Sequence, residues 1–268
     1  MKRIILYILI LLIIIPIISG CGSKETELAK HQAFAYKNST VKVTKDVKTI
    51  DINIDSGNLK IFSWDKEEIK YEAKHIVRDN KTDDQLDNML KKYSIVSDVK
   101  DKIYKISVGY DGKITNAQDF VTDIELTIPR YIKKINISQQ LGSIIVEDKI
   151  EGDIVAKLDS ASTEIKSING QLVLKGDSGN VRVNSGKLTN NSSIDISAGN
   201  IFVKAECQEQ SKYSFQTVKG NIELIFPIDS NILIDSFGTV KNNQFTGVEG
   251  NINIKASTKM GKISVNGY

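Results

Sequence analysis

Carboxylates are the side chains of this 268-residue chain that could most readily do chemistry, since it contains 33 Asp and Glu residues but only two His and two Cys. Five aspartates recur along its second half: Asp148, Asp153, Asp159, Asp177 and Asp195. If they converged on one face, they could bind calcium or cleave a polysaccharide. Aspartate is also common at turns, where its side chain hydrogen-bonds to the local backbone. The calcium-binding pattern Gly-Gly-x-Gly-x-Asp is absent, so the turn role is favoured.

Histidine and cysteine are too few for the usual acid–base or zinc sites. No His follows His75, which lies in an alternating segment typical of a strand, and His31 lies in a polar segment. For Cys207 a buried, inert thiol is favoured over a reactive one. The glycines do not form a phosphate-binding loop followed by a helix. The sequence therefore predicts no enzyme activity, no metal site and no cofactor.

The N-terminus has the features of an export signal. Lys2 and Arg3 precede an apolar run from residue 4 to 18, which is short for a membrane span. The segment Ile18-Ser19-Gly20-Cys21 resembles the lipobox of bacterial lipoproteins, in which the cysteine is acylated and becomes the new N-terminus. We expect a lipoprotein signal peptide over residues 1–20, lipidation at Cys21 and a flexible tether over 21–40. The alternative is an ordinary secretory signal with an incidental cysteine.

The formal net charge of +3 owes two charges to Lys2 and Arg3, so the chain after the signal is close to neutral. Its other arginines are only Arg78, Arg130 and Arg182. Nucleic-acid-binding surfaces are usually rich in arginine, so no nucleic-acid partner is expected.

A short pattern repeats along the chain: Gly, a small polar residue, an aliphatic, a variable residue and another aliphatic. Alternating aliphatics predict half-buried strands, and the glycines are expected to act as structural turn residues between them. These glycines are Gly57, Gly142, Gly170, Gly179, Gly199, Gly220, Gly250 and Gly261. We expect an all-β fold, a β-solenoid or β-roll of stacked short strands with two strands per coil of about 20 residues. The asparagines at 180, 200, 221 and 251 could stack as a ladder of side-chain amides.

The region 41–128 is β-rich but less repetitive, and the repeats fill 129–268. Within the first region, Thr82-Asp83-Asp84-Gln85 fits a capping box, and Leu86, Met89, Leu90 and Tyr93 form one apolar stripe. This pattern predicts one short helix over 83–93 that packs on the sheet or covers one end of it.

The segments Ile50-Asp51-Ile52 and Ser56-Gly57-Asn58-Leu59, the step Ile128-Pro129 and the successive Gly-Asn-Ile strands resemble the bacterial β-strand-repeat domains of unknown function that are often labelled putative adhesins. The resemblance covers residues 41–268. It implies a β-solenoid or β-roll and supplies no catalytic residues to this chain.

The sequence thus predicts a non-enzymatic, lipid-anchored protein on the extracytoplasmic face of the bacterial cell membrane, with an adhesin-like binding or spacer surface. Two alternatives stay open: an envelope-associated sensor or regulator lipoprotein, and a carbohydrate-active β-helix enzyme. Expected partners are the membrane, through Cys21, and a protein or glycan at the surface. Trp64 could stack a glycan, although a core plug is favoured. Exposed strand edges predict self-association, with the 263–265 segment less protected than the end near the helix.

Overall fold

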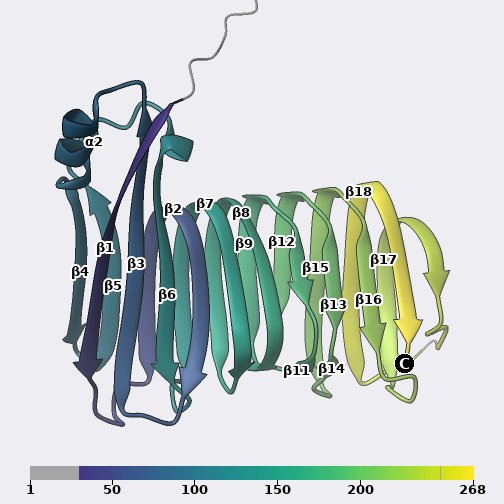
Figure 1. The fold of residues 1–268 in the computed structure, drawn as a ribbon. Helices are drawn as coiled ribbons and strands as arrows, with labels where there is room; N and C mark the ends of the chain where they lie inside the picture. The colour runs from purple at the N-terminus through teal and green to yellow at the C-terminus, as the bar shows by residue number, and fades with distance from the viewer. Residues whose placement is uncertain (1–29, 248) are drawn as a thin grey trace, which may run out of the picture.

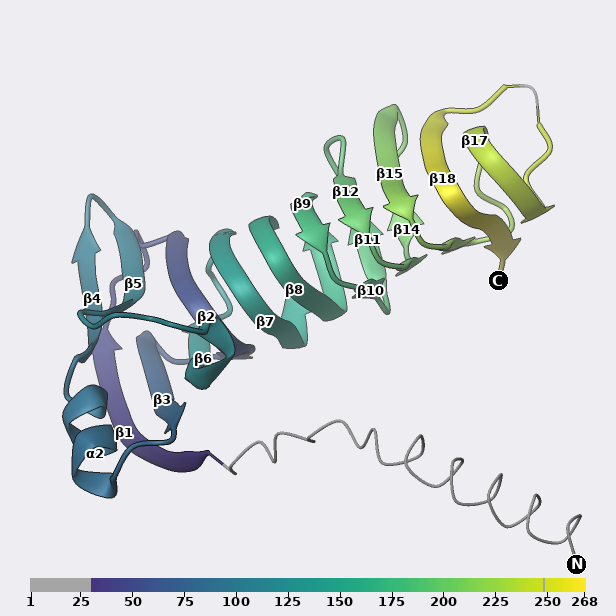
Figure 2. The same cartoon turned by 90° about the horizontal axis from the view of Figure 1, so that it is seen from above.

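The computed structural model describes residues 30–247 and 249–268, and most of them lie in β-strands that form one elongated stack (Figures 1 and 2). The expected signal peptide, Cys21 and the first part of the expected tether lie outside the described residues. The strands in the first part of the chain are β1 (His31–Lys42), β2 (Thr49–Trp64), β3 (Glu68–Asp79), β4 (Tyr93–Lys100), β5 (Ile103–Tyr110), β6 (Phe120–Pro129) and β7 (Lys134–Ile150). The strands that follow are β8 (Asp153–Gly170), β9 (Leu172–Ser178), β10 (Val181–Val183), β11 (Gly186–Leu188), β12 (Ser193–Ala198), β13 (Ile201–Lys204), β14 (Glu206–Cys207), β15 (Ser211–Lys219), β16 (Ile222–Phe226), β17 (Ile232–Asn243) and β18 (Ile252–Gly267).

The strands form two long ladders of hydrogen bonds, which we call ladder A and ladder B. Five long strands, β2, β7, β8, β17 and β18, bend at their middle and contribute their first half to ladder A and their second half to ladder B. Ladder A also contains β4, β5, β9, β12 and β15. Ladder B also contains β1, β3, β6, β10, β13 and β16. The long strands therefore tie the two ladders together.

Pairing among the repeat strands closes on itself, so the expected β-solenoid or β-roll of short strands is wrong. Strand β8 pairs with β9 through its first half and with β10 through its second half, and β18 does the same with β15 and β16. With β12 and β13 between them, these strands form a closed, parallel β-barrel of eight strands, and the remaining strands lie outside it. The fold remains all-β.

The physical reason for this closure lies at the corners. The sequence suggested that each repeat glycine turns the chain into a new strand, which would leave separate short strands. The long strands instead continue through their corners, at Gly142 in β7, at Ala161 in the 18-residue β8 and at Gly261 in β18. One continuous strand can then donate and accept hydrogen bonds in both ladders, which joins their ends.

Parallel register places like residues above one another in the interior. In ladder B, Ile165 pairs with Val183, Val183 with Val203, Val203 with Leu224, and Leu224 with Val265. All five side chains are fully buried. Burial of each such side chain contributes about 1.5–3 kcal/mol, so these columns supply most of the driving force for the stack.

The turn glycines form a second column, at the corner between the ladders. Five of the eight predicted glycines have positive φ: Gly57, Gly142, Gly179, Gly199 and Gly220. A Cβ atom on Gly199 would lie 2.1 Å from the carbonyl oxygen of Gly179, and one on Gly220 would lie 1.9 Å from that of Gly199. Gly170, Gly250 and Gly261 are instead required by close backbone approach, since the Cβ distances to neighbouring backbone are 2.2, 2.7 and 1.9 Å.

The expected tether is wrong from His31 onwards, because these residues form strand β1. All twelve residues of β1 pair with β3 in antiparallel register, from His31 opposite Asp79 to Lys42 opposite Glu68. Ala33, Ala35 and Val41 are partly buried against the core. The segment is polar enough to suggest a tether, but a full ladder of backbone hydrogen bonds and these three contacts hold it in the sheet.

The helix in this region is α2, which spans Asp83–Leu90 and contacts β1 and β3. Its first turn has the capping-box bond, with the Thr82 N–H donating to Gln85 Oε1 over 3.2 Å. Leu86 and Leu90 are buried, and Tyr93 already belongs to β4. The helix thus ends before the expected residue 93 and packs beside the first strands of the stack (Figure 1).

Candidate binding groove

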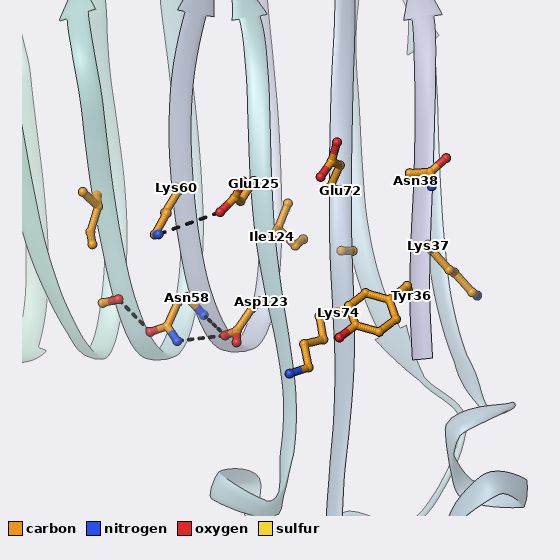
Figure 3. A pocket seen from close by; sticks show the side chains of 13 residues that line it. Tyr36, Lys37, Asn38, Asn58, Lys60, Glu72, Lys74, Asp123, Ile124 and Glu125 are labelled. Atoms are coloured by element: carbon orange, nitrogen blue, oxygen red, sulfur yellow. Dashed lines mark hydrogen bonds and ion pairs between the residues drawn. The ribbon is translucent and has the colours of Figure 1, made fainter. Parts of the chain in front are cut away.

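A groove lies on the outer face of ladder B, at the end of the stack near β1. It has a volume of about 640 Å³ and crosses β1, β3, β6, β2 and β7 (Figure 3). Along each of these strands alternate side chains point outwards, while Ala73 and Ile124 point to the core. The groove is therefore a surface built from every second residue of five paired strands.

The register of the strands aligns the groove residues in two rows. The first row follows the pairs Tyr36 with Lys74, Lys74 with Asp123, and Asn58 with Ser143. The second row follows the pairs Asn38 with Glu72, Glu72 with Glu125, Glu125 with Lys60, and Lys60 with Ile145. Backbone pairing fixes the spacing of both rows, so the side chains are held on a rigid base.

Hydrogen bonds orient the polar side chains of the first row. Asn58 donates from its backbone N–H and from Nδ2 to Asp123 Oδ1, over 3.0 and 2.8 Å. Ser143 Oγ donates to Asn58 Oδ1 over 2.7 Å. These contacts link β6, β2 and β7 and set the plane of the Asn58 amide (Figure 3).

The charges of the second row are paired with lysines. Glu72 and Glu125 are directly opposite each other, an arrangement that is unfavourable for two carboxylates. Lys60 lies 3.8 Å from Glu125, and Lys70 forms an ion pair with Glu72. Because these side chains are exposed, each pair contributes little to stability, but each offsets the repulsion locally.

The exposed aromatic side chain of Tyr36 on β1 forms one wall, and Phe34 packs beside it outside the groove lining. Phe34 and Tyr36 keep 51% and 68% of their surface exposed, and their rings pack edge to face with centroids 5.9 Å apart. The Lys74 ammonium lies 4.7 Å from the centre of the Phe34 ring and 5.9 Å from that of Tyr36. The Tyr36 ring is therefore the freer of the two to meet another molecule.

None of the five aspartates singled out from the sequence lines the groove, and Asp159 and Asp177 lie opposite each other in the paired strands β8 and β9. Asp148 accepts a hydrogen bond from the Ser63 N–H and Asp153 from the Gln171 N–H, each over 2.8 Å. Asp195 pairs with Lys175 in the register of β12 and β9. Within residues 30–247 and 249–268, no group of three or more His, Cys, Asp or Glu side chains is placed to hold a metal ion.

His75 lies inside the stack, fully buried in β3. Its Nδ1 is 2.9 Å from Thr122 Oγ1, and its ring stacks on Tyr93 with centroids 4.5 Å apart. Burial, with a smaller contribution from the Lys37 charge, lowers the pKa of His75 to about 4. The side chain is neutral at physiological pH and is packed as part of the core.

Cys207 and Trp64 are likewise held by contacts within the protein. Burial raises the pKa of the Cys207 thiol to about 12, so the reactive thiolate is scarce. Trp64 Nε1 donates to the Glu68 carbonyl over 2.7 Å, and Lys66 lies over its ring at 4.7 Å. Among the exposed aromatic residues, Phe34 and Tyr36 lie in the segment that was expected to be a tether. The alternation Ala33-Phe34-Ala35-Tyr36 was the signal that could have revealed them.

No helix within the described part of the chain is long and apolar enough to cross a membrane.

Comparison with known proteins gives structural matches alone. No family model matches the chain, and no curated protein matches it. Among solved structures, the chain is similar to a putative adhesin from Parabacteroides distasonis (13% identity, TM-score 0.48, covering 88% of this chain and 97% of that one). It is also similar to a putative adhesin from Bacteroides fragilis (16% identity, TM-score 0.46, covering 86% of this chain and 97% of that one). A third similar structure is a putative cell adhesion protein from Clostridium sporogenes (15% identity, TM-score 0.37, covering 88% of this chain and 100% of that one). These structures bear the name of the family that the sequence motifs resemble.

Proposed function

We propose that this protein is a non-catalytic, lipid-anchored protein of the bacterial cell surface, which binds partners through the outer face of its β-stack. The observation that carries the proposal is the groove of about 640 Å³ on ladder B. Its walls combine the exposed ring of Tyr36 with the oriented amide of Asn58 and paired charges, the mixture that binding surfaces use to fix a partner.

The expected lipid anchor would hold this groove near the membrane. Nine residues separate Cys21 from His31, the first residue of β1. A chain extends at most about 3.3–3.6 Å per residue, so these residues can span roughly 30 Å. Since β1 forms one wall of the groove, an acylated Cys21 keeps the groove-bearing end of the stack at the membrane side. The partner would then be a component of the envelope or a molecule that reaches it.

The anchor is tested by expressing the full chain in a bacterium supplied with an alkyne-labelled fatty acid. Wild-type protein is expected to carry the label and to fractionate with membranes, and intact cells are expected to expose it to added protease. The Cys21→Ser variant is expected to lose the label. Unlabelled wild-type protein that is released to the medium would show that an ordinary secretory signal operates instead.

The absence of catalysis is tested separately, by incubating the purified full chain with cell-wall and plant polysaccharides. We expect no release of reducing ends and no unsaturated products. Sustained turnover of any of these polymers would contradict the proposal and favour the carbohydrate-active alternative.

A further inference from the structure

We infer that the groove on ladder B binds a neutral oligosaccharide, with the sugar stacked on Tyr36 and hydrogen-bonded by the polar rows. This inference rests on the proposed function, because it names the ligand of the surface proposed there. It concerns residues 34–145 and does not involve Cys21.

The size of the groove suits a short stretch of a polymer. Its volume of about 640 Å³ lies in the middle of the range of about 300–1,000 Å³ that is common for small-molecule sites. Its lining comes from five adjacent strands (Figure 3), and the groove is not an enclosed cavity, so a long chain could enter it. An open groove of this kind fits a few sugar units of a glycan better than an enclosed small metabolite.

The charge of the groove favours a ligand without net charge. Its lining has three lysines and three carboxylates: Lys37, Lys60, Lys74, Glu72, Asp123 and Glu125. The charged groups of five of them already have partners, since Lys37 donates to the Tyr93 carbonyl, Lys60 pairs with Glu125, Lys70 with Glu72, and Asn58 with Asp123. A polyanion would meet the carboxylates and a polycation the lysines, so each would have to break these pairs. A polyhydroxylated, neutral ligand meets neither repulsion.

The aromatic wall supplies a surface for stacking. The face of an aromatic ring carries partial negative charge and attracts weakly positive C–H groups, such as those on one face of a pyranose ring. Tyr36 is 68% exposed, lies on β1 at the rim and has the more distant of the two contacts with Lys74. Phe34 packs against its edge and limits the positions that the ring can adopt.

The remaining lining groups suit hydroxyls, which both donate and accept hydrogen bonds. The Asn58 amide has two N–H groups, and its bond to Asp123 leaves a second one to donate. Asp123 and Glu125 are acceptors with more than one free lone pair, and Asn38 offers both roles. Asn58 is already oriented by Ser143 and Asp123, so little side-chain entropy is lost when it binds.

The experiment is calorimetric titration of the full-length protein, purified in a detergent without a sugar headgroup. The probes are cellohexaose and chitohexaose as neutral glycans, polygalacturonate as a polyanion and oligolysine as a polycation. We expect at least one neutral hexasaccharide to bind, and Tyr36→Ala to weaken that binding about tenfold, which corresponds to about 1.4 kcal/mol. Tyr36→Phe keeps the ring and is expected to retain binding.

Tyr268→Ala is the matched control. Tyr268 is 54% exposed and has the Lys204 ammonium 4.9 Å from its ring, but it lies at the other end of the chain. This variant is expected to bind like the wild type. No binding of either neutral hexasaccharide, equal binding by Tyr36→Ala, or tighter binding of a charged probe would each overturn the inference. Those results leave the fatty-acid labelling and turnover assays unchanged, so the two proposals fail independently.

Discussion

Asn200 Oδ1 accepts a hydrogen bond over 2.8 Å from the backbone N–H of Asn221; the two residues directly precede the paired strands β13 and β16 of ladder B. The same bond joins Asn200 N–H to Asn180 Oδ1 over 2.9 Å and Lys262 N–H to Asn221 Oδ1 over 2.9 Å. A ladder of side-chain acceptors and backbone donors thus follows the corner of the stack. The sequence suggested instead that the side-chain amides pair with one another. The side chain of Asn251, which was expected to belong to the ladder, is not part of it.

Asn200→Ala removes one acceptor from this ladder and leaves the Asn221 N–H without it. We expect a loss of about 0.5–1.5 kcal/mol in the free energy of unfolding, measured by urea denaturation. Asn200→Asp keeps an acceptor at the position and is expected to cost less. Equal stability of Asn200→Ala and an alanine variant of the exposed Asn253 in β18 would show that the ladder contributes nothing.

Gly220→Ala tests the glycine column. Gly220 has a φ of +151°, and a Cβ there would lie 1.9 Å from the Gly199 carbonyl oxygen. The strand must shift to accept it, so we expect a loss of about 2–4 kcal/mol and a lower Tm. Gly247→Ala is the control, since its Cβ would lie 3.4 Å from the nearest atom. A similar Tm for both variants would contradict the role of the column.

His75 predicts a dependence of stability on pH. Its pKa in the folded protein is about 4, below the ordinary value of 6.5, so the unfolded chain binds more protons between these values. Its contribution is fully present above about pH 6.5 and is lost as the pH falls towards 4, with a total on the order of 3 kcal/mol. Lys37 and the phenol of Tyr93 are the titratable groups around it.

The measurement for His75 is urea denaturation at a series of pH values, for the wild type and for His75→Phe. Phenylalanine keeps a ring against Tyr93 but cannot be protonated. The difference in unfolding free energy between the two proteins is expected to change across pH 4–6.5 and to stay constant above it. A difference that does not vary with pH would show that His75 is not the group responsible.

Cys207 is expected to resist thiol reagents in the folded protein. Its thiol is buried and its pKa is raised to about 12, so both access and thiolate are lacking. In a Cys21→Ser chain, where Cys207 is the remaining cysteine, the reaction with a disulfide reagent should become fast only in denaturant. Rapid labelling under native conditions would mean that the β14 region opens readily.

Self-association through a strand edge remains a prediction, but the edge expected to be exposed is now β17 instead of residues 263–265. Residues 263–265 pair with β16 on one side and with β17 on the other, so they are not an open edge. Strand β17 lies beyond them, with Phe237 65% exposed and Val240 44% exposed. An edge of this kind can pair with a second copy.

We therefore expect the Cys21→Ser chain to form dimers at high concentration in sedimentation experiments, and Val240→Lys to shift it to monomer. Val218→Lys introduces the same charge on β15, which is paired on both sides, and is the control. The prediction is wrong if the Cys21→Ser chain without a further substitution stays monomeric at every concentration.

Local patterns of the sequence were sufficient for the strands of the repeat and for α2. Alternating aliphatics such as Val181 and Val183 identify a half-buried strand without reference to the rest of the chain. The Thr82 capping box likewise depends on four consecutive residues. These features were predictable because their physical causes are local.

Closure and the groove were not predictable in this way. Whether β8 ends at its corner or continues depends on which strands lie beside Ala161, and no local pattern states this. In the groove, Tyr36, Lys74 and Asp123 meet only because β1, β3 and β6 pair in antiparallel register. A one-residue change of register would turn each of these side chains to the other face.

The parallel pairing also determines how many residues this protein needs for each increase in the length of its stack. Val181 pairs with Ile201, so about 20 residues advance the stack by one strand spacing, which is about 4.8 Å. The same 20 residues in an α-helix would extend about 30 Å. The stack therefore gains little length for each residue and presents a broad surface of paired strands instead.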